Sequence, residues 1–116
     1  MKVLFDHNIA RPLAQYLTNH TVSRTGPLGW ARLQNGALIA AAEARGFEVM
    51  VTGDKNIEYQ QRLTGRKIAI VSLSAINWPV IKPHVAAIVK AVDKATPGTY
   101  QKVQCGHYRR QSLPYR

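Results

Sequence analysis

Short apolar runs recur along the chain and are separated by longer stretches with helical spacing, which constrains the fold more than any other feature. The clearest run is "KIAIVSL" at residues 67–73, which is rich in β-branched side chains and apolar on both faces. Such a run is typical of a central strand in a parallel sheet. Strands that alternate with helices predict an α/β domain with a mostly parallel sheet and right-handed crossovers.

The turn and cap residues set the boundaries of these elements. Pro12 suits the first turn of a helix, Asn35 suits an N-cap, and Gly46 suits a helix end. We expect a Rossmann-like three-layer sandwich with four strands in the order 2-1-3-4 and a fifth at an edge. Residues 1–98 would form the domain, and 99–116 a basic tail that begins with the edge strand. The expected strands are residues 2–6, 20–24, 47–52, 67–73 and 99–104, and the expected helices are 11–19, 36–45, 56–63 and 79–94.

The charge balance indicates the kind of partner. Sixteen Lys and Arg residues stand against six Asp and Glu residues, which leaves a net charge of +10. A domain this basic usually meets a polyanion, because binding releases counterions from the phosphate backbone. We therefore expect a nucleic acid or an acidic protein as partner. A charge that serves solubility alone is the open alternative.

Membrane insertion and secretion are not indicated. No apolar run is long enough to span a bilayer, and the run after Lys2 already ends at Asp6, too early for a signal peptide. The single cysteine, Cys105, excludes an internal disulfide and fits a reducing compartment. We expect a cytoplasmic protein without membrane contact.

Two carboxylates are expected to meet at one edge of the sheet. The strand order 2-1-3-4 places the ends of the first and third strands side by side at the topological switch point. Asp6 ends the first of these strands, and Asp54 follows the other after Gly53. Carboxylate oxygens there suit Mg²⁺ or Mn²⁺, which can promote phosphodiester hydrolysis. Capping of the following helices is an equally weighted alternative for both aspartates, and the two roles can coexist.

The sequence does not support a nucleotide-binding motif, a serine-hydrolase motif or a zinc site. There is no G-x-G-x-x-G or Walker sequence, and no serine has a G-x-S-x-G setting. Cys105 and His107 lack the further ligands that a zinc site needs. Trp30 and Trp78 could stack on nucleic-acid bases, but we expect them to anchor the core or a loop.

Four segments together resemble the PIN-like domain family, in particular a small bacterial group found in toxin–antitoxin settings. They cover most of residues 2–100, in the same order and with similar gaps. A strand ending in D-x-N, a strand ending in T-x-D, and the "QNG" and "YQQ" sequences are the most specific parts. The segments are "LFDHNIARPL" at 4–13, "GWARLQNGALIAAAEARGFEVMVTGDKNIEYQQRL" at 29–63, "IAIVSLS" at 68–74 and "WPVIKPHVAAIVKAV" at 78–92.

The resemblance implies a metal-dependent ribonuclease, in which acids at the ends of parallel strands hold a divalent metal. Carried over by position, Asp6 and Asp54 correspond to the metal ligands, and Asn8 and Thr52 to supporting hydrogen-bond groups. Asn56 stands where relatives often have a further acid. Candidate substrate contacts are His7, Arg11, Asn35 and Lys55. A lone exposed histidine such as His7 is more often incidental, which is the open alternative for that residue.

One position departs from the family pattern. Relatives with the "NG" helix start are expected to carry a glutamate next, where this chain has Ala37. Glu43 lies about two helical turns further on, too far to replace it. Ala37 is compatible with an engineered substitution, with natural decay into a binding protein, or with an activity that does not need the acid.

Three functions follow as hypotheses. The first is a Mg²⁺- or Mn²⁺-dependent ribonuclease with an impaired site, acting as the toxin of a toxin–antitoxin pair with RNA, an acidic antitoxin and a second copy of the chain as partners. The second is an inactive RNA- or partner-binding module with the same fold. The third is a regulatory α/β domain whose aspartates are only caps.

Overall fold

The computed structural model describes residues 1–33, 35–53 and 65–105. The expected helix at residues 56–63 and the chain from residue 106 onward lie outside these ranges. No helix in the described ranges is long and apolar enough to cross a bilayer. The elements are β1 (Lys2–Phe5), the 3-10 helix η1 (Arg11–Tyr16), β2 (Thr21–Arg24), α1 (Asn35–Ala44), β3 (Val49–Thr52), β4 (Ala69–Leu73), α2 (Trp78–Ile81), the 3-10 helix η3 (Lys82–His84), α3 (Val85–Asp93) and β5 (Tyr100–Val103).

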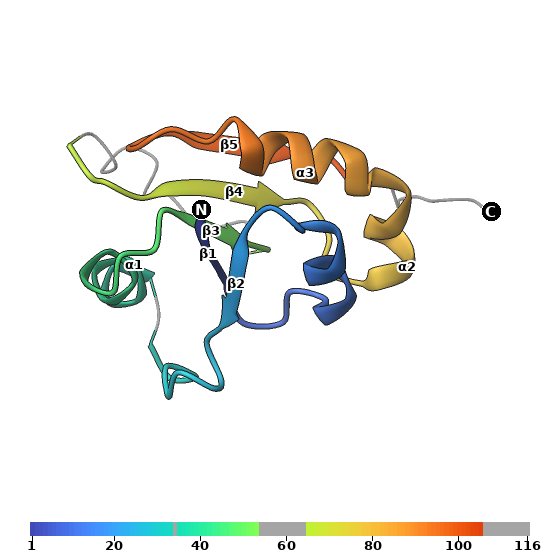
Figure 1. The fold of residues 1–116 in the computed structure, drawn as a ribbon. Coiled ribbons are helices and arrows are strands. Elements are labelled where there is room, and N and C mark those ends of the chain that lie inside the picture. The colour runs from blue at the N-terminus through green and yellow to red at the C-terminus, as the bar shows by residue number, and fades with distance from the viewer. Residues whose placement is uncertain (34, 54–64, 106–116) are drawn as a thin grey trace.

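The five strands form one parallel sheet in the order β2-β1-β3-β4-β5 (Figure 1). This confirms the expected order and the expected edge strand near residue 100. Every residue of β3 and of β4 is buried. Both strands are therefore covered on their two faces, as the uninterrupted apolar run at residues 67–73 predicts.

Alternate side chains of the strands enter two separate cores, which makes three layers. Val3 and Phe5 belong to the core that also contains residues of η1, α2 and α3. Leu4, between them, belongs to the core on the other face, with residues of α1. The described part of the chain is thus an α/β/α sandwich in which α1 covers one face of the sheet and η1, α2 and α3 cover the other.

The crossover connections between parallel strands do not all have the same handedness. The step from β2 to β3 and the step from β4 to β5 run in the same direction across the sheet. Nevertheless, α1 lies on one face and α2 and α3 lie on the other. Two parallel connections that step the same way over opposite faces have opposite hands. The expectation of uniformly right-handed crossovers, which holds for nearly all such units, is therefore wrong for this chain.

Two of the expected helices differ from the structure. The helix expected at residues 11–19 is a 3-10 helix that ends at Tyr16, and its N-cap, Ala10, makes no side-chain cap hydrogen bond. The helix expected at 79–94 is divided into α2, η3 and α3. The division falls at Pro83, which has no N–H to continue the helical hydrogen-bond pattern.

The end of α1 follows the expectation for Gly46. This glycine has a φ of 81°, and its N–H donates to the carbonyl of Glu43. The N–H of Phe47 donates to the carbonyl of Ala42. This pair of hydrogen bonds is the Schellman motif, which needs a left-handed residue and so favours glycine.

Candidate functional site

Asp6 lies where β1 and β3 end together. Its backbone N–H donates to the carbonyl of Val51 at 2.9 Å, so the pairing of the two strands continues one residue past β1. One carboxylate oxygen accepts the N–H of His7 at 2.7 Å, and the other accepts the hydroxyl of Thr52 at 2.6 Å. The Asp6 side chain is 14% exposed. The predicted adjacency of the ends of β1 and β3 is confirmed, whereas the predicted partner of Asp6 there, Asp54, lies outside the described residues.

Asp6 does not cap the helix that follows it. The N-cap of η1 is Ala10, and no side chain caps this helix. The carboxylate instead bonds the next residue and the neighbouring strand. The capping alternative is therefore wrong for Asp6. Asp54 lies outside the described residues, so both alternatives stay open for it.

A side chain at Gly53 would displace the side chain of Ile76. The φ of Gly53 is not in the left-handed region, but a Cβ at this position would collide with Cγ2 of Ile76, in the loop after β4. The Cδ1 of Ile9 lies 3.9 Å from the same point. A glycine after Thr52 thus allows the loop after β4 to approach the end of β3.

His7 connects the end of β1 to the loop before α1. Its Nδ1 lies 2.7 Å from the hydroxyl of Thr25, and its Nε2 donates to the carbonyl of Leu33 at 2.9 Å. Thr25 is buried, and the Nε2 of His7 is 3.9 Å from a carboxylate oxygen of Asp6. Sequence reasoning did not find Thr25. Its position directly after β2, at the edge that holds Asp6, is the signal that could have found it.

The other predicted residues are distributed around this edge. Asn8 has a φ of 69°, a conformation that asparagine tolerates better than most residues, and its side chain is exposed. Arg11 is exposed at the start of η1, and Ala37 is exposed in the first turn of α1. The side chain of Asn35, and all of Lys55 and Asn56, lie outside what the structure describes.

The described residues supply one candidate ligand for a divalent metal at this edge, the carboxylate of Asp6. No three of their His, Cys, Asp or Glu side chains come together as a group that could hold an ion. Asp6 supplies a hard carboxylate whose oxygens each accept one hydrogen bond and keep a further lone pair. A carboxylate already fixed by two donors is oriented for a ligand. Further oxygen ligands would have to come from water or from residues such as Asp54.

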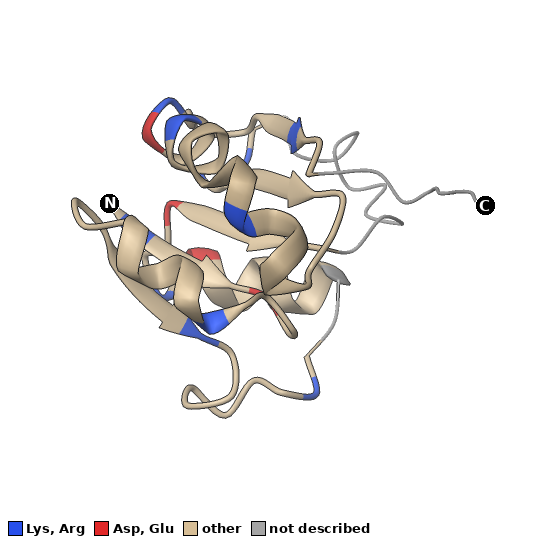
Figure 2. Ribbon diagram, turned by 90° about the vertical axis from the view of Figure 1, so that its right-hand side faces the viewer, with Lys and Arg blue, Asp and Glu red and all other residues tan. Residues whose placement is uncertain are grey.

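Basic residues lie on several elements around this edge. Arg24 ends β2, Arg11 begins η1, and Arg32 is exposed in the loop before α1. Figure 2 shows Lys and Arg on helices, strand ends and loops, with few Asp or Glu between them. An anion that approached Asp6 would therefore meet positive charge from the segments after both β1 and β2.

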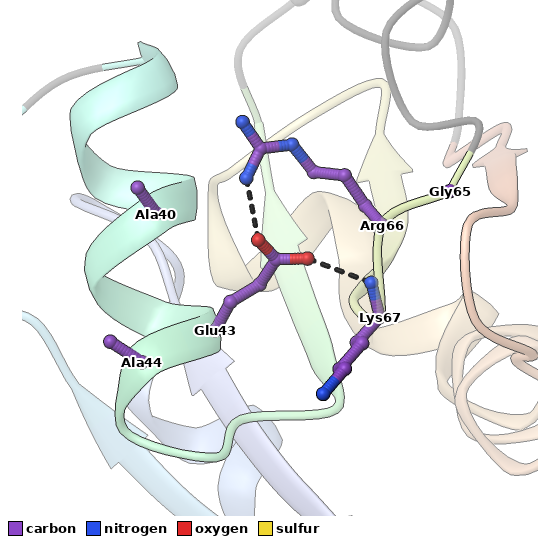
Figure 3. A pocket seen from close by; sticks show the side chains of 6 residues that line it. All are labelled: Ala40, Glu43, Ala44, Gly65, Arg66 and Lys67. Carbon is purple, nitrogen blue, oxygen red and sulfur yellow. Dashed lines mark hydrogen bonds and ion pairs between the residues drawn. The ribbon is translucent and has the colours of Figure 1, made fainter.

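A hollow in the described residues lies elsewhere. It has a volume of about 400 Å³ and is lined by the second half of α1 and by residues 65–67, directly before β4 (Figure 3). These segments are at the amino edge of the sheet, whereas Asp6 is at the carboxyl edge. The hollow is therefore not the site of the aspartate.

Both carboxylate oxygens of Glu43 accept hydrogen bonds beside this hollow. Its carboxylate accepts a hydrogen bond from Arg66 Nη1 at 2.5 Å and from the N–H of Lys67 at 2.7 Å (Figure 3). Burial by itself raises the pKa of Glu43, but the Lys67 N–H and the Arg66 guanidinium outweigh it and lower the pKa below its ordinary value. The prediction that Glu43 cannot replace an acid at residue 37 is supported by this placement.

Comparison of the chain with models of known protein families, with curated proteins and with solved structures finds no match. The PIN-like assignment thus depends on the motif residues alone. Any function has to be argued from the site itself.

Replacing Thr52 with Val should lower the free energy of unfolding by about 1–3 kcal/mol, because an oxygen of a mostly buried carboxylate loses its donor. Thr52→Ser should recover most of the loss. Urea unfolding at pH 7 measures both. In a double-mutant cycle with Asp6→Asn, the Thr52→Val cost should shrink; an unchanged cost would show that this hydrogen bond does not stabilise the fold.

Replacing Glu43 with Gln should destabilise the protein in a pH-dependent manner. The lowered pKa means that the carboxylate stabilises the fold above its unfolded-state pKa of about 4.5 and that this stabilisation is lost as the pH falls through the folded-state pKa. The difference in urea midpoint between Glu43→Gln and the parent chain should therefore be largest near pH 7 and shrink below pH 4.5. A difference that is constant with pH would contradict the charge-assisted role of Glu43.

Proposed function

We propose that this domain is a PIN-like, metal-dependent ribonuclease whose site is centred on Asp6, and that it acts as the toxin of a toxin–antitoxin pair. The observation that carries the proposal is the Asp6 carboxylate, fixed by Thr52 and the His7 N–H at the switch point of a parallel sheet. Ligand sites of open α/β sheets lie at this place.

The charge distribution supports RNA as substrate. The chain has a net charge of +10. Three of the four acids in the described residues form hydrogen bonds with partners away from Asp6. Their partners are the N–H of Lys2 for Glu48, the ring of His20 for Asp93, and Arg66 for Glu43. Among the described acids, only Asp6 itself is therefore left at this edge to repel a phosphate backbone.

Each residue has a role in this proposal. Asp6 and Asp54 hold Mg²⁺ or Mn²⁺, which supplies a Lewis acid for phosphodiester hydrolysis. Thr52 and Asn8 support the site, and Asn56 provides a neutral oxygen where an acid is absent. Arg11 and Lys55 neutralise the phosphate backbone, and His7 holds the loop before α1 against the site. An acidic antitoxin would complement the basic surface, and a second copy of the chain is a further partner.

One observation favours a second function, an inactive RNA- or partner-binding module. Ala37 is exposed in the first turn of α1 and cannot bind a metal. A site with fewer acids binds a divalent ion weakly and repels RNA less, which suits binding without cleavage.

Restoring an acid at residue 37 separates these two functions. Ala37→Glu should cleave single-stranded RNA in Mn²⁺ at least about tenfold faster than the parent chain, a change of about 1.4 kcal/mol in the barrier. Ala37→Gln has a similar size without the charge and should not. Adding Asp54→Asn to Ala37→Glu should abolish the gain. If the Ala37→Glu variant binds RNA but does not cleave it, the ribonuclease proposal is wrong and the binding-module proposal is supported.

Metal binding can be measured without activity. Calorimetric titration of the parent chain with Mn²⁺ should give a saturable heat that Asp6→Asn and Asp54→Asn each remove, because each loses one carboxylate ligand. Glu43→Gln should keep the heat, since Glu43 lies at the opposite edge of the sheet. A chain whose aspartates serve only the fold would give no such heat.

A further inference from the structure

The described residues have two exposed large hydrophobic side chains, one in contact with a tryptophan and the other two residues before it in the chain. Tyr16 is 43% exposed and Ile76 is 37% exposed. The Tyr16 ring lies against Trp78, with 5.8 Å between the centroids and 36° between the planes. Ile76 precedes Trp78 by two residues in the chain. We call these three residues the aromatic patch.

The aromatic patch stands on fixed elements. Tyr16 ends η1, whose Leu13 is fully buried, and Trp78 begins α2, whose Ile81 is fully buried. Trp78 itself is partly buried against the same core. The two rings are therefore held in place before any ligand arrives, so that little side-chain freedom is lost on binding.

The aromatic patch adjoins the candidate site. Ile76 is so close to Gly53 that no Cβ fits between them, and Gly53 directly follows Thr52, which bonds Asp6. Exposed cations occur on the same two elements: Arg11 begins η1, and Lys82 follows the end of α2, one helical turn after Trp78. Apolar rings and exposed cations thus occur on the same two elements.

We propose that the aromatic patch is a base-stacking subsite for single-stranded RNA, next to the proposed cleavage site. Exposed rings flanked by basic residues are the usual means of holding unpaired bases. A duplex hides the faces of its bases, so only unpaired nucleotides can use the patch. Stacking on rings reads no base edge, and the subsite should therefore tolerate different bases. This inference depends on RNA being the ligand but does not require that it is cut.

The chain has two tryptophans, which makes a direct test possible. Trp30 lies on the other face of the sheet, with its ring 6.1 Å from Phe47 and close to Arg45. Trp30→Phe leaves Trp78 as the single reporter, and its fluorescence should be quenched by an unstructured oligouridine or oligoadenosine in EDTA. Trp78→Phe leaves Trp30, which should not respond. Equal quenching of both reporters, or of neither, would overturn the subsite.

Affinity gives a second readout. Tyr16→Ala should weaken binding of the same oligonucleotide about tenfold in EDTA, the usual effect of losing one stacking ring, while Tyr16→Phe should bind as the parent chain does. A duplex of equal length should bind both variants alike. The dependence on salt should not change for Tyr16→Ala, whereas Arg11→Ala should reduce its slope. Equal affinities of Tyr16→Ala and the parent chain would sink the proposal.

The subsite and the cleavage site can fail separately. Quenching of Trp78 without Mn²⁺-dependent cleavage would support the subsite and contradict the nuclease. Cleavage with no quenching of Trp78 and no effect of Tyr16→Ala would support the nuclease and contradict the subsite. If Tyr16→Ala instead alters only self-association in sedimentation experiments, the aromatic patch is a contact between copies of the chain, and the stacking proposal is wrong.

Discussion

The parallel pairing of β1 with β3 is the constraint on which the candidate site depends. Phe5 pairs with Val51, and the next two residues, Asp6 and Thr52, are joined by a hydrogen bond between their side chains. Both strands are buried on two faces, so a shift of one residue would move every side chain into the wrong core. The register that the two cores impose therefore also fixes which hydroxyl meets the Asp6 carboxylate.

The four acids that the structure describes are divided between the two edges of the sheet. At the amino edge, Glu43 joins α1 to the segment before β4 through Arg66 and the N–H of Lys67. At the carboxyl edge, Asp6 is the acid that the structure describes. The other described acids have their partners elsewhere in the fold, which leaves Asp6 apart from them.

The hand of the last crossover decides where Trp78 lies. Because α2 and α3 cover the same face as η1, the start of α2 comes against the end of η1, and the rings of Tyr16 and Trp78 touch. A crossover of the opposite hand would have carried α2 to the face of α1. The aromatic patch is thus a consequence of topology, and no spacing in the sequence relates residue 16 to residue 78.

The amino-acid sequence by itself predicted the strands, their parallel order and the adjacent ends of the first and third strands, because short apolar runs that alternate with helical segments favour a parallel α/β sheet. It also placed the end of α1, since Gly46 suits the left-handed conformation found there. The tertiary structure alone decided the hand of the last crossover, the role of His7 in holding the loop before α1, and the engagement of Glu43 by Arg66. These depend on contacts between segments far apart in the chain, and their energies are not encoded in any local pattern.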